Sequence, residues 1–409
     1  MLPEGWSRRP LGEIARITSG GTPDRAEPSY WGGDIPWVTT GEIRFNTITD
    51  TTERITAAGL KNSSAKVFPP GTLLMAMYGQ GKTRGQVAKL GIEAATNQAC
   101  AAITLNPGHH PDYFFQVLAS KYDDIRELGN AGTQKNLNGG IIKEIEVPVP
   151  EITEQLRIGQ LLACWDETMA ATAKLLVNSR RQKQALIESL ISGKCRLKGE
   201  TTSWPLVALK EVASILVSSV DKKHENGERP VSLCNYTDVY YNDHITSDIP
   251  FMAATATEGE IAKFSLRRGD VLITKDSETP DDIAISAHVA DEIPGLICGY
   301  HLAIVRPDLA RVDSEFLHGF FGLRRTRAYF TSHANGATRF GLPIHAIEDA
   351  RLQLPGIAEQ RRIAQVVSAS TQRIHCLARD LIALKTEKSA LMQQLLTGKR
   401  RLSFPESAP

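Results

Sequence analysis

The sequence predicts an α+β protein in which two mixed α/β domains are joined by two long antiparallel coiled-coil helices, as a tandem duplication with a pseudo-twofold axis. Three observations predict this fold. A 48-residue segment occurs twice, at a constant offset of 205 positions, with 17 identical residues. Apolar residues in both copies recur at alternating spacings of four and three. The segments before each copy hold short apolar runs separated by Gly, Pro, Asn and Asp, which is typical of a mixed sheet.

The repeat is clearest where each helix is expected to begin and to end. At the start, VPVPEITEQLRIGQLL (Val147–Leu162) aligns with LQLPGIAEQRRIAQVV (Leu352–Val367). At the end, KQALIESLISGKCRL (Lys183–Leu197) aligns with KSALMQQLLTGKRRL (Lys388–Leu402). Identity at this level over one fixed offset indicates a duplicated structural unit.

The duplication divides the chain into a globular domain (1–150), a helical spacer (151–198), a second globular domain (199–355) and a second helical spacer with the C-terminal tail (356–409). Their net charges are 0, +3, −7 and +5 in that order, so basic helices alternate with neutral or acidic domains. Weaker similarity relates the two globular domains, because the frame W-x4-L-x-E-x-A begins at both Trp6 and Trp204.

Both helical segments carry an apolar seam over about five heptads, which is the signature of a coiled coil. Each follows a proline and ends at a glycine, Gly193 or Gly398, as expected for a helix C-cap. Two unrelated amphipathic helices are the alternative, but they do not explain why both copies share register and length. The predicted seam comprises Ile158, Leu162, Trp165, Met169, Leu176, Leu186 and Leu190 in the first helix and Ile363, Val367, Ile374, Leu377, Leu381, Leu384, Leu391 and Leu395 in the second.

The globular domains are expected to mix strands and helices. Apolar runs bounded by Gly and Pro predict strands over Ile35–Val38 and Thr72–Met75. Apolar residues at helical spacing predict a helix over Pro111–Leu128, with its counterpart over Ser314–Phe330.

Composition restricts the class of protein. A chain of 409 residues with 42% hydrophobic and 23% charged residues is ordinary for a multidomain soluble protein. No signal peptide or membrane span is expected, and six scattered cysteines without a Cys-x-x-Cys pair favour a reduced, cytoplasmic protein. Neighbouring His109 and His110 have no further ligand at useful spacing, so we expect no metal site.

One stretch suggests a different function. AMYGQGKT (Ala76–Thr83) fits a relaxed phosphate-loop pattern, which needs a strand before it and a helix after it. The following RGQVAKL (Arg84–Leu90) has an early glycine and no amphipathic run, so it reads as strand, loop, strand. We therefore expect no nucleotide site here. The second copy has ITKDSETPDDIAIS (Ile273–Ser286) at this place, without the glycine–lysine–threonine.

Taken together, these motifs resemble those of the specificity subunits of type I restriction-modification enzymes. The resemblance covers nearly the whole chain and rests on the repeated P-x-I-x-E-Q-x-R-I, the repeated helix end L-[IL]-[ST]-G-K, the opening GGTP…YWGGDIPW (Gly20–Trp37) and GTQ-x-x-L (Gly132–Leu137). It implies two target-recognition domains, each reading one half of a bipartite DNA site, with a spacing set by the helices.

The resemblance also implies partners that do the chemistry. These are two methyltransferase subunits, which use S-adenosylmethionine, and restriction/translocase subunits, which use ATP and magnesium. We expect no catalytic residue and no bound cofactor in this chain, because it lacks an Asn-Pro-Pro-[Tyr/Phe] motif, a glycine-rich adenosylmethionine loop and a nuclease P-D…E-x-K motif.

Polar residues in the loops that follow equivalent strands are the expected contacts with double-stranded DNA. Arginine and lysine bind phosphates or guanine, glutamine pairs with adenine, and carboxylates accept from cytosine N4. The expected residues are Lys82, Thr83, Arg84, Gln86, Gln134, Lys135 and Asn136 in the first copy and Lys275, Asp276, Ser277, Glu278, His301, Thr338 and Arg339 in the second.

Alternatives remain open at this point. The loops could be hairpin tips that touch only solvent. The chain could be the target-recognition subunit of a type IIB or IIG-like restriction-methylation enzyme, which the catalytic subunits encoded beside it would reveal. It could also be a coiled-coil scaffold that binds proteins, which a salt-dependent DNA-binding assay would distinguish.

Overall fold

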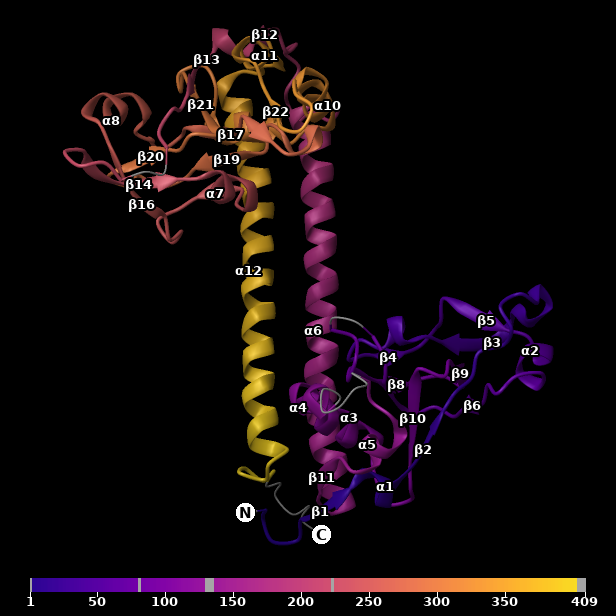
Figure 1. The fold of residues 1–409 in the computed structure, drawn as a ribbon. Coiled ribbons are helices and arrows are strands. Elements are labelled where there is room, and N and C mark those ends of the chain that lie inside the picture. The colour runs from indigo at the N-terminus through magenta and orange to yellow at the C-terminus, as the bar shows by residue number, and fades with distance from the viewer. Residues whose placement is uncertain (1, 80–81, 129–135, 222–223, 403–409) are drawn as a thin grey trace. The chain divides into compact units, whose positions relative to one another are not determined.

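The computed structural model describes residues 2–79, 82–128, 136–221 and 224–402. The chain forms two compact units (Figure 1). Unit 1 consists of Met1–Thr172 and Asp380–Pro409, and unit 2 consists of Ala173–Arg379. Each unit therefore combines one globular domain with parts of both long helices. The domain boundaries at residues 150, 198 and 355 stay a prediction. Among the described residues, no helix is long and apolar enough to cross a membrane.

Unit 1 is built on three sheets. Its strands are β1 (Ser7–Pro10), β2 (Ala15–Ser19), β3 (Trp31–Val38), β4 (Thr47–Ile48), β5 (Glu53–Ile55), β6 (Val67–Phe68), β7 (Leu73–Ala76), β8 (Val87–Leu90), β9 (Ala94–Thr96), β10 (Cys100–Leu105) and β11 (Glu146–Val149). A five-stranded sheet has the order β2-β10-β7-β8-β4, a four-stranded sheet has the order β5-β3-β9-β6, and β1 pairs with β11.

Unit 2 repeats this plan. Its strands are β12 (Leu206–Ala208), β13 (Ala213–Val217), β14 (Arg229–Cys234), β15 (His244–Ile245), β16 (Met252–Ala256), β17 (Val271–Thr274), β18 (Asp276–Ser277), β19 (Ser286–Val289), β20 (Leu296–Cys298), β21 (Leu302–Pro307), β22 (Phe340–Gly341) and β23 (Arg351–Gln353). The five-stranded sheet β13-β21-β17-β19-β15 matches that of unit 1 strand for strand, and β12-β23 matches β1-β11. The duplication inferred from the helices thus extends to the domains.

Short helices cover these sheets. They are α1 (Leu11–Ile14), α2 (Ala57–Lys61), α3 (Pro111–Ser120), α4 (Tyr122–Leu128) and α5 (Gly139–Lys143) in unit 1, and α7 (Tyr236–Tyr241), α8 (Glu258–Phe264), α9 (Ser314–Phe321), α10 (Arg324–His333) and α11 (Ile344–Glu348) in unit 2. Single 3-10 turns lie at Pro28–Tyr30, Thr40–Glu42, Leu209–Glu211 and Pro280–Asp282.

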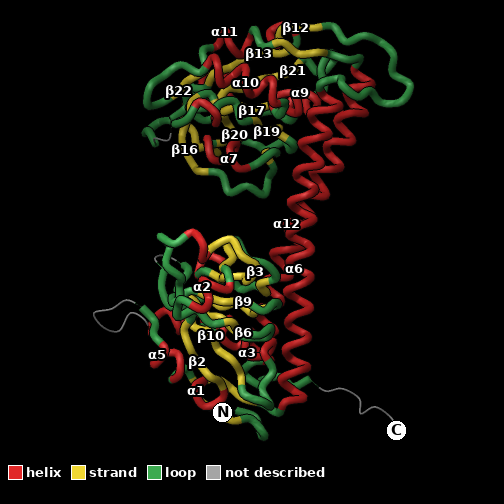
Figure 2. The backbone as a smooth tube through the Cα atoms, turned by 90° about the vertical axis from the view of Figure 1, so that its right-hand side faces the viewer, coloured by secondary structure: helices red, strands yellow, loops and turns green. Residues whose placement is uncertain are grey.

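The two domain helices expected from the sequence are each broken. The first divides into α3 and α4 at Lys121, and the second divides into α9 and α10 at Gly322 and Leu323. Buried apolar residues of α3 pack against those of the five-stranded sheet of unit 1 and of the long helix at Ile158 and Leu162. Figure 2 shows α3 beside that helix. The apolar periodicity continues through each break, which is why the sequence predicts a single helix.

The long helices are α6 (Ile152–Leu186), which continues as a π-helical turn (Ile187–Ile191), and α12 (Ile357–Leu395). Gly193 and Gly398 follow them with φ of 74° and 70°, the left-handed conformation of a C-cap glycine. Every residue of the predicted seam is buried or half-buried. In unit 1, Lys388 Nζ lies 2.6 Å from Asp166 Oδ1, and Arg401 Nη2 lies 2.7 Å from Glu154 Oε2, so the two helices run antiparallel there.

The repeated Glu-Gln pair anchors the start of each helix. In unit 1, Glu154 accepts hydrogen bonds from the indole N–H of Trp6 (3.0 Å) and from Arg401. The amide of Gln155, which is 1% exposed, donates to the carbonyl of Pro150 and accepts from the backbone N–H of His110. The glutamate therefore joins its own domain to the residues that follow the other helix.

Unit 2 contains the same arrangement with the roles of the helices exchanged. Glu359 accepts from the indole N–H of Trp204 (3.1 Å) and binds the guanidinium of Arg196 through two hydrogen bonds of 2.7 and 2.8 Å. Gln360, fully buried, donates to the carbonyl of Pro355. This explains why P-x-x-x-E-Q and G-K-x-R are repeated together: each unit needs the start of one helix and the end of the other.

Candidate nucleic-acid interface

Two loops occupy the same place in the two units. Tip loop 1 (residues 77–86) connects β7 to β8, and tip loop 2 (residues 275–285) connects β17 to β19. Both pairs of strands are antiparallel neighbours, so each loop is the tip of a hairpin. The expected order of strand, loop, strand is confirmed for the glycine–lysine–threonine stretch. No helix N-terminus faces this loop from the residues that follow it, since β8 begins at Val87.

The two tip loops close in the same way. In tip loop 1 the N–H of Gly85 donates to the carbonyl of Ala76, and in tip loop 2 the N–H of Ala284 donates to the carbonyl of Thr274, both at 2.9 Å. The closing residues have φ of 83° and 54°. Glycine adopts such values readily, whereas alanine at this φ is strained. Unit 2 therefore keeps the same backbone turn, although Ala284 does not favour the positive φ that the turn requires.

In each unit a second segment of the chain is hydrogen-bonded to the first residue of the tip loop. The N–H of Leu137 donates to the carbonyl of Met77 (3.1 Å), and the N–H of Leu342 donates to the carbonyl of Lys275 (2.9 Å). Both leucines are buried. The residues just before each leucine are thereby brought beside the loop, as expected for Asn136 in unit 1 and for Arg339 in unit 2.

Tip loop 1 presents part of its expected set to solvent. Lys82 and Asn136 are exposed, while Thr83 and Gln86 are half-buried. Arg84 is only 9% exposed, and its guanidinium donates to the carbonyl of Arg126 (3.2 Å). This hydrogen bond joins tip loop 1 to the segment that contains Arg126. The DNA contact expected for Arg84 stays a prediction. Gln134 and Lys135 lie outside the described residues.

Tip loop 2 gathers most of its expected set into one polar cluster. His301 Nδ1 lies 2.9 Å from Asp276 Oδ2, and the guanidinium of Arg339 lies 3.0 Å from His301 Nε2. Lys275 Nζ is 3.2 Å from the same carboxylate. An imidazole that donates from Nδ1 and accepts at Nε2 satisfies the hydrogen bonds of the row arginine–histidine–aspartate throughout. Pairing of β18 with β22 places Asp276 opposite Gly341, two residues after Arg339.

The remaining residues of the second set differ in exposure. Glu278 and Thr338 are exposed, whereas Ser277 is 6% exposed and its hydroxyl lies 3.5 Å from that of Tyr236. The exposed residues are thus accessible to a large ligand. Ser277 belongs to the support of the loop.

Exposed tyrosines at both loops were missed by the sequence interpretation. Tyr78 in tip loop 1 is 41% exposed, and Tyr300, just before β21, is 49% exposed. The ring of Tyr300 lies 4.4 Å from that of His301, and Lys275 Nζ lies 5.7 Å from its centroid. Each tyrosine lies next to a glycine within a polar stretch. This pattern in the sequence could have predicted that both rings are exposed. Such side chains are suited to contact sugars or bases.

Part of the sequence is similar to known proteins. Residues 3–177 match the family described as type I restriction modification DNA specificity domain. The MjaIX specificity subunit of a type I restriction enzyme from Methanocaldococcus jannaschii is 27% identical over 190 residues, which are 45% of this chain and 42% of that protein. The EcoR124I/EcoR124II specificity subunit from Escherichia coli is 25% identical over 162 residues, 38% of this chain and 40% of that protein. The chain thus spans less than half the length of these relatives.

Solved structures share the fold over nearly the whole chain. The S subunit of a type I restriction-modification system from M. genitalium has a TM-score of 0.62 at 15% identity, covering 96% of both chains. A chain from a study of complex assembly and conformational transition of the type I system has a TM-score of 0.58 at 17% identity, covering 98% of this chain and all of that one. With the duplicated units and the repeated Glu-Gln anchors, the chain resembles type I restriction-modification specificity subunits, and residues 3–177 match the DNA specificity domain of that family.

Proposed function

We propose that this chain is the DNA-recognition subunit of a type I restriction-modification complex, in which each unit reads one half of a bipartite, asymmetric target. One observation carries the proposal: the two tip loops share their backbone hydrogen bonds and differ in their side chains. A common frame with exchanged polar groups is what two readers of different base sequences require, because base edges differ in their donors and acceptors.

The chemistry of the two loops supports different half-sites. Lys82 and Gln86 offer a cation and an amide in unit 1. Arg339 and Asp276, joined through His301, offer a guanidinium and a carboxylate in unit 2. Arginine is suited to guanine O6 and N7, glutamine to adenine, and a carboxylate to the amino group of cytosine. His301 holds the arginine in position before DNA arrives, which lowers the entropy lost on binding.

The long helices act as the spacer between the half-sites, and the reaction itself belongs to partner subunits. We infer that two methyltransferase subunits supply S-adenosylmethionine chemistry and that restriction/translocase subunits supply ATP-driven cleavage with magnesium. The chain contributes no catalytic residue and acts by positioning these subunits on the target. The weak net charge of +1 fits a subunit whose partners add many of the phosphate contacts.

The test is methylation mapping of DNA from cells that express the chain with its methyltransferase partner. Arg339→Ala should relax the preference at a position of one half-site, by about 1–3 kcal/mol. Arg325→Ala, an exposed arginine on α10 whose guanidinium donates to the side chain of Gln353, is the matched control and should leave the target unchanged. An Arg339→Ala variant with an unchanged target, or methyl transfer to DNA by the purified chain alone, would contradict the proposal.

A further inference from the structure

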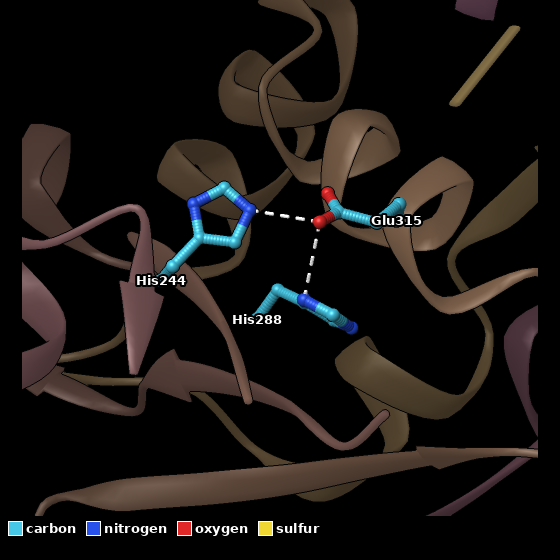
Figure 3. Close-up of side chains that lie close together, drawn as sticks. All are labelled: His244, His288 and Glu315. Carbon is cyan, nitrogen blue, oxygen red and sulfur yellow. Dashed lines mark hydrogen bonds and ion pairs between the residues drawn. The ribbon is translucent and has the colours of Figure 1, made fainter. Parts of the chain in front are cut away.

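Two histidines and a glutamate converge in unit 2, away from tip loop 2. His244 lies in β15, His288 lies in β19, and Glu315 is the second residue of α9. Figure 3 shows both imidazoles directed at the same carboxylate. One potential ligand atom from each residue lies within 4.8 Å of the others. The DNA-reading role described above makes no use of this cluster.

The distances within the cluster fit a small cation. His244 Nε2 lies 2.8 Å and His288 Nδ1 lies 3.3 Å from Glu315 Oε1. Ligands about 2.0–2.1 Å from a tetrahedral zinc ion stand roughly 3.3 Å apart, so small side-chain rotations would bring all three atoms to coordinating positions. Two imidazoles with one carboxylate are a donor set that favours zinc over magnesium or calcium.

His288 has the orientation of a metal ligand. Its side chain is 9% exposed, and Nδ1 is buried without a hydrogen-bond partner. Nε2 lies 2.9 Å from the hydroxyl of Ser314. If Nε2–H donates to Ser314, Nδ1 is left as a lone pair that faces the carboxylate of Glu315. Two acceptors in contact repel each other unless a cation lies between them, and a second-shell hydrogen bond of this kind is what fixes a ligating imidazole.

At the equivalent place, unit 1 has different side chains. The register of β4 with β8 pairs Thr47 with Lys89, as the register of β15 with β19 pairs His244 with His288. Asp112 is the second residue of α3, as Glu315 is of α9. In unit 1 the ammonium of Lys89 binds the carboxylate of Asp112 directly.

A lysine supplies the cation there. Unit 2 has replaced the lysine and the threonine with two imidazoles, each of which offers a lone pair where unit 1 offers a charge. We propose that His244, His288 and Glu315 bind one divalent cation of the zinc class, which takes the place of the lysine ammonium of unit 1.

The fourth coordination position opens into a cavity of about 600 Å³. Ser314, Thr371 and His375 are among the residues that line it. The ion ties the edge of the five-stranded sheet to α9, and water or His375 completes its shell.

The test uses the purified full chain, stripped with a chelator and then equilibrated with Zn²⁺ alone. We expect one bound ion per chain by metal analysis and a rise in the thermal unfolding midpoint on adding zinc. His288→Lys copies unit 1 and should keep the fold through a new ion pair with Glu315 while losing the bound ion. His345→Lys, at an exposed position on α11, is the matched control and should keep it.

Two results would overturn the proposal. One is a parent chain that binds no zinc at micromolar concentration, which would mean that protons rather than a metal ion join the three side chains. The other is retention of the ion in His288→Lys. If that variant does not fold, His244→Thr takes its place, since Thr47 is the equivalent residue of unit 1. It too should fold and lose the bound ion. Loss of zinc in these variants with an unchanged methylation target would leave the proposed DNA-reading function intact.

Discussion

Asp270 and Arg306 form a buried ion pair in unit 2 that unit 1 lacks. Two hydrogen bonds of 2.8 and 2.7 Å join them, and the aspartate side chain is 2% exposed. The strand registers place Thr72 and Thr104 at the equivalent positions of unit 1. The same sheet is therefore stable with either pair. Unit 1 thus serves as the reference for how much the ion pair of unit 2 contributes to stability.

Arg306→Thr should destabilise unit 2 by about 3–5 kcal/mol, because it leaves a buried carboxylate without its partner. Adding Asp270→Thr to that variant reproduces the pair of unit 1 and should restore most of the loss. Urea unfolding of the two variants beside the parent chain measures this. If the double variant were as unstable as the single one, the pair would not be interchangeable with the threonines and the strict equivalence of the two sheets would be wrong.

At the scale of single elements, tip loop 1 is a hairpin that carries a phosphate-loop sequence. Because β8 follows it, the loop has no helix N-terminus to hold phosphates. We expect no saturable ATP binding by the chain, and Lys82→Ala should weaken or alter DNA recognition only. Lys61→Ala, an exposed lysine on α2, serves as the control in both assays. ATP binding by the parent chain that disappears in Lys82→Ala would show the interpretation to be wrong.

The long helices should set the number of unread base pairs between the half-sites. Four residues inserted after Thr172 move the rest of α6 by about 6 Å and turn it by roughly 400°, so the apolar seam continues with a small offset. We expect the unread gap to lengthen by about one or two base pairs while both half-sites stay the same. Two inserted residues turn the seam by about 200° and should abolish methylation. Methylation mapping of both insertion variants measures the number of unread base pairs. An unchanged gap after the four-residue insertion would contradict the role of the helices.

Elements defined by neighbours in sequence could be predicted, and contacts between distant segments could not. The spacing of apolar residues and the 205-residue offset predict both long helices, since helix formation depends on residues three and four apart. The partner of Glu154 is Arg401, 247 positions away, and no local pattern links them. Glu315 and His244 are likewise 71 positions apart. Aligning the two copies residue by residue is the signal for the second of these contacts, because Lys89 and His288 then fall at equivalent positions.

For the molecule as a whole, we propose that each of the two equivalent units reads one half of the DNA target. The five-stranded sheets of the two units have the same strand order and both units have the same anchors, yet their tip loops carry different side chains. Exchanging residues 1–150 for the corresponding domain of another specificity subunit should therefore be tolerated, provided that the incoming domain keeps the tryptophan at position 6. That indole, with Arg401, completes the contacts of Glu154.

The most direct test is genome-wide methylation mapping in cells that express this exchanged chain with the methyltransferase partner. We predict that one half of the target changes to that of the donor, while the other half and the number of unread base pairs between them stay as in the parent. A target in which both halves change together, or in which neither changes, would contradict it.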